Sequence, residues 1–323
     1  MEYEISTWVS AAAYAAGGLA IGFGAIGAAV GEGHAASCAV MAMGRTPEKS
    51  SEILKLMLVG QAVAESASIF ALVVAMLLLF TTFPANYVTV SVVVSAGLCM
   101  GLGAIGSGIG SGYPAGAACE GLSRQPAVEA KLMTNMLVGS AVAQTPAIFS
   151  LVISFILMFT DFSSRPVSPT WAAILGAGIS TGLSAIGPGI GCGLVAQASC
   201  EGVARHPSNA APITNLMLLA QAVTQTTAIY GLLISFILIF KEVPAAESIV
   251  PPMALLSAGI CMGLGAFGPG LGEGFVGQKA VEWTAKNINA VGDLTRTMLV
   301  GQAVAESTGI YSLVISLIMI FVF

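Results

Sequence analysis

The chain has 323 residues, of which 56% are hydrophobic and 8% are charged, and its mean hydropathy is +0.90. So few polar residues could not cover the surface of a soluble domain of this size, which indicates a protein of the lipid bilayer. The net charge of −5 is small and the basic residues form no patch, which argues against nucleic acid as a partner.

The sequence starts with an acidic segment, Met1 to Glu4, that leads directly into a long apolar stretch. A secretory signal would have a basic start and a shorter apolar core, so we expect no cleavable signal. The cysteines are scattered through apolar segments without a Cys-x-x-Cys spacing or a histidine cluster. We interpret them as small packing residues rather than as disulfides or metal ligands.

Four similar units of about 80 residues follow one another along the chain. In each unit a Gly/Ala-rich apolar segment leads through a short polar loop to a Leu/Ile/Phe-rich apolar segment. The motif at 22–27 recurs at 101–106, 182–187 and 263–268, and the motif that starts at Met57 recurs from Met136, Met217 and Met298. Because about 20 helical residues span the hydrocarbon core, the sequence predicts an all-α membrane protein. We expect eight transmembrane helices as four tandem helical hairpins, at 1–84, 85–165, 166–246 and 247–323.

The two predicted helices of each hairpin differ in composition. Glycines four residues apart, such as Gly27 and Gly31, mark the first helix and would let backbones approach closely in a crowded inner layer. The second helix carries bulky apolar side chains, as a lipid-facing outer layer should. The Gly-x-Gly-x-x-Gly pattern at 22–27 also occurs in dinucleotide-binding turns, but no predicted strand precedes it and it recurs in similar form in every unit. We therefore assign these glycines to packing.

Basic residues are distributed unevenly along the chain. Of the eleven Lys and Arg residues, all but Arg165 and Lys241 lie in or near the four hairpin loops. By the positive-inside rule, we expect the loops in the cytoplasm and both termini outside, in a bacterial plasma membrane.

Ionisable residues in the middle of membrane helices are costly and mark candidate functional sites. Glu65 and Glu306 lie near the centres of the second helices of the first and last units, where the middle units have Gln144 and Gln225. Glutamine can form hydrogen bonds but cannot change its charge. The candidate ion sites are therefore confined to the two end units.

The first helices carry acids in the same two units. Glu32 and Glu273 are flanked by glycines, and the middle units have Ser111 and Cys192 at these positions. If the two glutamates of a hairpin lie at one depth, both can be ionised only with a cation between them, and otherwise one takes a proton. The pattern predicts a site for a hard cation such as Na⁺, or for H⁺, without an organic cofactor.

Hydroxyl groups near the second-helix glutamates are further candidate ligands. Ser66 and Ser307 follow the glutamates directly, and Thr308 and Tyr311 come next in the last unit. For the serines and threonines the alternative is a hydrogen bond to a carbonyl of the preceding helical turn. The sequence leaves both interpretations open.

At these residues the chain resembles the c subunit of F-type ATP synthases, and the resemblance extends over all four units. The segment 301–311 is similar to the outer helix of the Na⁺-translocating members, and the loop Arg124-Gln125-Pro126 is similar to the polar loop of the family. The resemblance implies a non-catalytic, ion-carrying subunit of a rotary ATPase whose hairpins assemble into a two-layer rotor ring.

The resemblance also implies a ligand set. In this family an inner-helix Gln or Glu and the outer-helix Glu of one hairpin hold Na⁺, together with a backbone carbonyl and a Ser hydroxyl of the adjacent hairpin. By position it implicates Glu32, Glu65, Glu273, Glu306, Ser66 and Ser307, and the carbonyls of Val63 and Val304. Tyr311 would orient Glu306, and Thr308 would help to hold a water.

The units depart from this pattern in two ways. The first has Ala67 and Phe70 where the last has Thr308 and Tyr311, which predicts a weaker or more proton-like first site. The middle units lack the carboxylate, and Pro146 would break the backbone hydrogen-bond ladder next to one lost site. The sequence does not tell whether the next hairpin or another copy completes each site, so Val142, Thr145, Val223 and Thr226 stay candidate ligands.

As partners, the resemblance implies further copies or other proteolipids in a ring, membrane lipid, and a stator a-type subunit that supplies an arginine. A central stalk would contact the polar loops at Arg45, Arg124, Gln125, Pro126 and Arg205. Fusion with loss of carboxylates is similar to the duplicated proteolipids of V-type pumps. Because fewer ions then move per ATP, a steeper gradient can be opposed, so we expect ATP-driven pumping rather than synthesis.

Two other classes of protein must be weighed. A stand-alone cation channel or secondary transporter could use the same glutamates, but such transporters usually have inverted repeats and broken helices around one site. These units are parallel copies. A purely structural membrane scaffold would leave the paired acids without a role.

Overall fold

The computed structural model describes residues 4–322, so the segment Met1 to Tyr3, on which the expectation about a signal partly depends, lies outside the described residues. Within that range the regular structure is helical. In chain order the helices are α1 (Ile5–Arg45), α2 (Ser50–Phe80), α3 (Tyr87–Arg124), α4 (Glu129–Phe159), α5 (Val167–Ser184), α6 (Ile186–Arg205), α7 (Ala210–Thr224), α8 (Thr226–Phe240), α9 (Val250–Lys286) and α10 (Val291–Phe321).

The polar loops between the two helices of each hairpin contain one short 3₁₀ turn each. These turns are η1 (Pro47–Lys49), η2 (Pro126–Val128), η3 (Pro207–Asn209) and η4 (Ile288–Ala290). Proline opens the first three, where its missing N–H costs nothing. In the described part of the chain, eight helical stretches are long and apolar enough to cross a membrane, which confirms the predicted number of spans.

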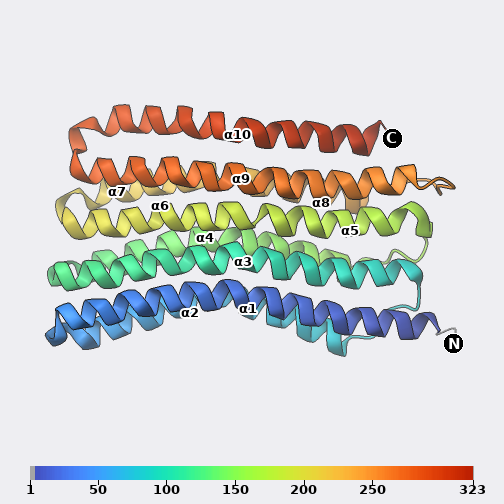
Figure 1. Ribbon diagram of the computed structural model, residues 1–323, viewed down its shortest axis with the longest axis horizontal. Coiled ribbons are helices and arrows are strands. Elements are labelled where there is room, and N and C mark those ends of the chain that lie inside the picture. Colours follow the sequence, from blue (N-terminus) through green and yellow to red (C-terminus); the bar gives the residue numbers. More distant parts are fainter. Residues whose placement is uncertain (1–3, 323) are drawn as a thin grey trace.

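The helices form two layers. The first helices of the hairpins, α1, α3, α5 with α6, and α9, lie side by side in chain order, and α2, α4 and α7 with α8 lie behind them (Figure 1). Each of these three second helices touches the first helix of its own hairpin and also the first helix of the next hairpin. The α10 helix lies beside α9 at the edge. The first and last hairpins are therefore the two ends of the assembly.

Glycines set the close spacing of the first layer. A Cβ on Gly193 would lie 2.5 Å from the carbonyl carbon of Gly110, and a Cβ on Gly112 would lie equally close to that of Gly31. Such distances are too short for any side chain, so the backbones of α1, α3 and α6 touch directly. Close packing of this kind holds membrane helices together where lipid provides no hydrophobic drive.

Two of the spans are interrupted near their centres. The break between α5 and α6 at Ala185 precedes Pro188, which has no N–H to donate to the carbonyl of Ser184. The other break, between α7 and α8, lies at Gln225. By contrast, α4 continues through Pro146, although this proline has no N–H to donate to the carbonyl of Val142.

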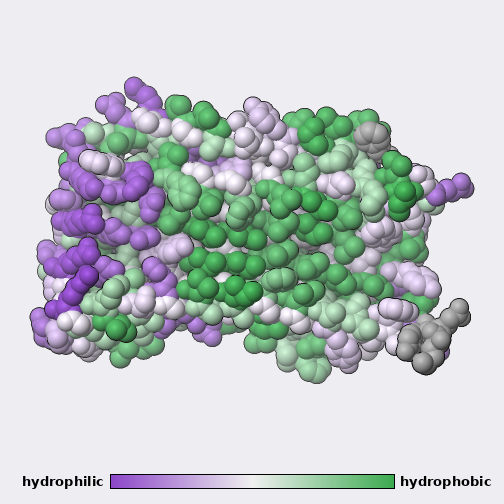
Figure 2. Space-filling view, in the orientation of Figure 1, coloured by the Kyte–Doolittle hydropathy of each residue, from purple (hydrophilic) through white to green (hydrophobic). Residues whose placement is uncertain are grey.

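Polar side chains gather at one end of the molecule. Figure 2 shows an apolar band across the middle of the visible face and hydrophilic residues at the end opposite the two termini, where the hairpin loops lie. At this end Glu120 of α3 forms ion pairs with Arg124 at 2.8 Å and with Arg45 of the preceding hairpin at 3.6 Å. The apolar band is the surface that a bilayer would cover.

Candidate functional site

The glutamate or glutamine position of each second helix faces the preceding hairpin. Gln144 Nε2 donates to the carbonyl of Val63 at 2.9 Å, and Gln225 Nε2 donates to the carbonyl of Val142 at 2.8 Å. Glu306 follows the same rule, because Tyr230 of the third hairpin donates its hydroxyl to Oε1 of Glu306 at 2.6 Å. The chain therefore has three boundaries between consecutive hairpins, and all three have the same geometry. At each boundary the glutamate or glutamine position of one hairpin lies against the hairpin before it.

The two glutamine boundaries are closed by amide hydrogen bonds. Gln144 Nε2 also donates to Ser111 Oγ at 2.9 Å, so it links both helices of its own hairpin to the hairpin before. Val142 is the residue whose carbonyl Pro146 cannot bond in the helix, and the amide of Gln225 pairs with that carbonyl instead. In both boundaries a neutral N–H group thus occupies the place where a cation would meet the backbone carbonyl.

The boundary between the third and fourth hairpins is different, because it contains two carboxylates. Glu273 has no exposed surface, and among the described residues neither of its carboxylate oxygens has a hydrogen-bond partner. A buried carboxylate without partners is unstable unless it takes up a proton or a cation.

A third residue sets the depth of the two acids. Gln302, one turn before Glu306, donates from Nε2 to the backbone carbonyl of Glu273 at 3.2 Å and to that of Ala220 in the third hairpin at 3.1 Å. This amide ties α10 to α9 and to α7 at the level of the acids. The equivalent Gln221 makes the same two bonds one boundary earlier, to Cys192 and Gly139.

Further oxygen atoms at this boundary lack partners. Within residues 4–322, the buried Thr227 Oγ1 and Gln302 Oε1 have no hydrogen-bond partner. Thr227 faces the fourth hairpin, since its Cγ2 would lie 3.5 Å from a Cβ on Gly309. Together with the two carboxylates these are hard oxygen donors, which fit an alkali cation better than a soft metal. Among the described residues, no group of three or more His, Cys, Asp or Glu could hold a metal ion.

The other predicted pair, Glu32 and Glu65, lies on the free face of the first hairpin. Gln61 Nε2 donates to the carbonyl of Glu32 at 3.2 Å, as Gln302 does for Glu273. Glu65 is exposed, because no hairpin of this chain precedes it. The pair therefore lacks the preceding hairpin that lies against Glu306 in the last unit.

The resemblance implied that Tyr311 orients Glu306, but in this chain another tyrosine makes that hydrogen bond. Val304 and Tyr311 are 67% and 66% exposed and lie on the free face of α10. Tyr230, not Tyr311, bonds Glu306. Likewise the carbonyl of Val63 meets Gln144 rather than either glutamate of its own hairpin.

The serines and threonines next to the glutamate position donate to carbonyls of their own helices. Ser66 Oγ bonds the carbonyl of Ala62 at 3.1 Å, and Ser307 Oγ bonds that of Val304 at 2.7 Å. Thr226 and Thr308 bond Val223 and Ala305 in the same way. Back-bonding, the alternative left open above, is thus present in all four, and it leaves an oxygen lone pair on each hydroxyl.

Sequence reasoning missed Tyr230 and Thr227, although the sequence held a signal for both. Tyrosine occupies this position in the third and fourth units, at 230 and 311, and phenylalanine occupies it in the first two, at 70 and 149. Compared within one unit, these residues show no relation to the glutamates. Compared with the next unit, Tyr230 precedes the unit with Glu306, whereas Phe70 and Phe149 precede the units with glutamine at 144 and 225.

The predicted loop residues lie together at the polar end. Arg205 pairs with Glu201 at 3.2 Å, one turn back, as Arg124 pairs with Glu120. Gln125 ends α3, and Pro126 starts the 3₁₀ turn that follows. Their side of the molecule is the polar one that projects beyond the apolar band.

Comparison with known proteins agrees with the repeat. The model of the ATP synthase C-subunit family matches residues 15–78, 94–157, 175–238 and 256–319. The ATP synthase c subunit of Petrotoga mobilis is 53% identical over 68 residues, which are 21% of this chain and 71% of that protein. The A-type ATP synthase K subunit of Methanocaldococcus jannaschii is 29% identical over 228 residues, which are 70% of this chain and 93% of that protein.

Proposed function

This chain belongs to the ATP synthase C-subunit family, and we propose that the cargo it carries is Na⁺, held between Glu273 and Glu306 and at a second site formed with Glu32 and Glu65. It is an ion-carrying, non-catalytic rotor subunit of a rotary ATPase, embedded in the membrane by several spans. Membership of this family argues against a stand-alone channel, a secondary transporter and a structural scaffold.

One observation carries the choice of cargo. Glu273 is fully buried and its two carboxylate oxygens have no hydrogen-bond partner among residues 4–322, while the nearby Glu306 is held by a tyrosine hydroxyl. If both carboxylates are ionised, they need a bound cation between them, whereas a proton carrier needs only one acid.

The ligand set that we propose follows the observed boundary. Glu273 and Glu306 supply carboxylate oxygens, and Thr227 supplies a buried hydroxyl from the preceding hairpin. The carbonyl of Val223 and the hydroxyl of Thr226 correspond by position to Val63 and Ser66 in the first hairpin. Tyr230 orients Glu306 without touching the ion.

We infer that the parent enzyme pumps. Only the first and last hairpins carry glutamates at the mid-membrane positions, so each copy moves fewer ions than four independent hairpins would. Moving one charge against 100 mV costs about 2.3 kcal/mol, so a lower ion-to-ATP ratio lets one ATP work against a steeper gradient. The ion-to-ATP ratio of the reconstituted enzyme decides this, since a value equal to that of a ring with one acid per hairpin would refute it.

Members of this family form rings that work with an a-type subunit and a stalk. For this chain we propose that the a-type subunit supplies the arginine opposite Glu65 and Glu306, and that the stalk meets the loops at Arg45, Arg124, Gln125, Pro126 and Arg205. We also propose a bacterial plasma membrane with the loops in the cytoplasm, and units that meet at 84/85, 165/166 and 246/247. The concentration of basic residues at the loop end supports this orientation.

A carbodiimide that modifies protonated carboxyl groups tests the cargo. The purified complex is treated at fixed pH with increasing Na⁺, with K⁺ as the control salt, and modified peptides are located by mass spectrometry. Na⁺ should protect Glu306, and K⁺ at equal ionic strength should not. Labelling that depends on pH but not on Na⁺ would assign the cargo as H⁺.

A further inference from the structure

Gln225 lies at the boundary between the second and third hairpins, immediately before the segment of α8 that meets the fourth hairpin. We propose that Gln225 is a positioning residue for the cation site of the next boundary. Its hydrogen bond to Val142 fixes the end of α7, and this in turn fixes where α8 places Thr227 and Tyr230. The inference rests on the proposed function and adds a residue that acts on the site through its neighbours in the chain.

The break between α7 and α8 gives the first argument. Within residues 4–322, the second helices α2, α4 and α10 continue through the glutamate or glutamine position, and only the third is interrupted there, at Gln225. The carbonyl of Gln225 accepts from the N–H of Ala228 at 3.1 Å and from that of Ile229 at 3.2 Å. The bond from Ala228 spans three residues, as in a 3₁₀ turn, and such a turn inside a helix often marks a hinge.

The helix before the break is fixed by hydrogen bonds to both neighbouring hairpins. Gln221 Nε2 donates to the carbonyl of Gly139 in the second hairpin at 3.0 Å, and the carbonyl of Ala220 accepts from Gln302 in the fourth at 3.1 Å. Gln225 adds a bond of 2.8 Å to the second hairpin directly at the break. The end of α7 is therefore a fixed point from which α8 continues.

The helix after the break carries the contacts to the acids. Tyr230 donates its hydroxyl to Oε1 of Glu306 at 2.6 Å, and Thr227 is fully buried beside the fourth hairpin. Both residues lie within two helical turns of the break. Further along α8, Ser235 Oγ donates to the carbonyl of Ala177 at 2.6 Å. The segment that meets the acids is thus held at both ends, and release of one end should displace it.

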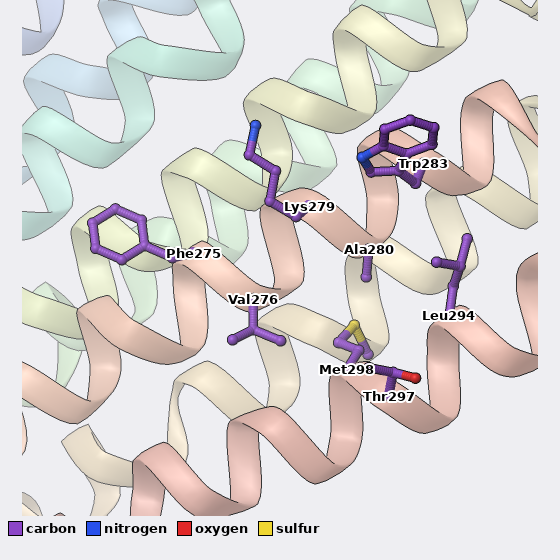
Figure 3. A pocket seen from close by; sticks show the side chains of 8 residues that line it. All are labelled: Phe275, Val276, Lys279, Ala280, Trp283, Leu294, Thr297 and Met298. Carbon is purple, nitrogen blue, oxygen red and sulfur yellow. The ribbon is translucent and has the colours of Figure 1, made fainter.

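The fourth hairpin itself gives Glu306 little support. A pocket of about 410 Å³ lies between α9 and α10 on the loop side of the acids, with Val276 and Met298 among the residues that line it (Figure 3). Few side chains of α10 are buried within residues 4–322. The orientation of Glu306 therefore depends on the contact that α8 provides.

Pro146 explains why this boundary needs a side-chain amide. Proline has no N–H, so the carbonyl of Val142 lacks the donor of its own helix and is open to Gln225. Gln144 makes the equivalent contact to Val63, whose helix contains no proline at this point. The helix that carries Gln144 is continuous, and the boundary after it has glutamine and cysteine in place of the two acids. Gln144 is therefore a matched control.

Gln225→Leu tests the proposal, because leucine cannot donate a hydrogen bond. In the purified complex the Na⁺ concentration that half-protects Glu306 from carbodiimide should rise about tenfold, as when one hydrogen bond to a charged group is weakened. The value for Glu65, which lies in another hairpin, should not change. Gln144→Leu should change neither value. An unaltered value for Glu306 in Gln225→Leu, or an equal rise in Gln144→Leu, would overturn the proposal.

A second variant separates positioning from stability. Pro146→Ala returns an N–H to α4, so the double variant with Gln225→Leu again satisfies the carbonyl of Val142. Its melting temperature should return toward that of the unaltered protein. The Na⁺ concentration that half-protects Glu306 should stay raised, because the bond between the two hairpins is still missing. Recovery of both quantities together would show that Gln225 only stabilises the fold, and would overturn the proposal.

The rate of modification distinguishes failure of this proposal from failure of the proposed cargo. In Na⁺-free medium at fixed pH, Glu306 of Gln225→Leu should react faster relative to Glu65 of the same chain, because Tyr230 no longer holds its carboxylate. If Na⁺ protects neither glutamate of the unaltered complex, the cargo proposed above fails. The ratio of the two rates then still decides the role of Gln225, and an unchanged ratio would overturn it.

Discussion

Tyr230 of the third hairpin donates a hydrogen bond of 2.6 Å to Glu306 of the fourth. The glutamate that we propose as an ion ligand is therefore oriented by the hairpin before it and not by its own helix. If Na⁺ binds at this boundary, changes in either of the two hairpins should alter its binding.

The inner carboxylate should decide whether the ion is bound at all. Glu273→Ala removes both unpartnered oxygens, and we expect Na⁺ to lose its protection of Glu306 against carbodiimide. Glu273→Gln keeps one oxygen ligand and should retain weakened protection. Equal protection in the alanine variant and the unaltered protein would show that Glu273 is no ligand. Glu282→Gln, in the same helix but in an ion pair with Lys279 at the loop end, is the matched control.

Replacement of Thr227 should have two effects of opposite sign, one on stability without Na⁺ and one on Na⁺ binding. Its buried hydroxyl has no partner among the described residues. Thr227→Val should therefore raise the free energy of unfolding by about 1 kcal/mol in Na⁺-free medium. If the hydroxyl is a ligand, the same variant should bind Na⁺ less tightly. Thermal unfolding in detergent with and without Na⁺ measures both, and a loss of stability in Na⁺-free medium would contradict the assignment.

Loss of the side-chain amide should destabilise the protein more at Gln225 than at Gln144. Gln225→Leu leaves the carbonyl of Val142 with neither the amide nor a helical donor, because Pro146 lies four residues on. We expect a cost of about 1–3 kcal/mol, measured by thermal unfolding. Gln144→Leu is the matched control, since Val63 has Ala67 as a helical donor, and it should cost less. The reverse order would show that the proline does not set the requirement.

Close backbone contact should make one class of glycine intolerant of any side chain. Gly193→Ala places a Cβ 2.5 Å from the carbonyl carbon of Gly110, so α3 and α6 must separate, and we expect a loss of several kcal/mol or failure to assemble. Gly292→Ala meets nothing within 4 Å in the described chain and should be neutral or slightly stabilising. Similar melting temperatures for the two variants would refute direct backbone packing of the first layer.

Much of the fold could be predicted because each feature has a local cause. Long apolar runs fixed the spans, and the repeat fixed the hairpins and their order. The glycine spacing of Gly27 and Gly31 correctly predicted a crowded layer, since close packing needs positions without side chains. The helix breaks at Ala185 and Gln225 were not predicted, and proline alone does not decide where a helix ends, since α4 continues through Pro146.

The candidate site was harder to predict, because its residues belong to different units. The four glutamates and their pairing could be identified within a hairpin, where the chain itself brings the helices together. The role of Tyr230 depends on which way each hairpin faces its neighbour, and a single unit holds no such information. For the same reason Phe70 suggested a weak first site, whereas in the structure its position belongs to the boundary with Gln144.

The order of the hairpins has a consequence for motion. Glu306 lies in the last hairpin of a chain and Glu65 in the first, with two glutamine hairpins between them. In a circle of copies joined head to tail, cargo positions come as adjacent couplets followed by a gap two hairpins wide. During rotation such a ring would take up two ions in quick succession and then none while the two glutamine hairpins pass. The torque would therefore be uneven, and the stalk would have to even it out.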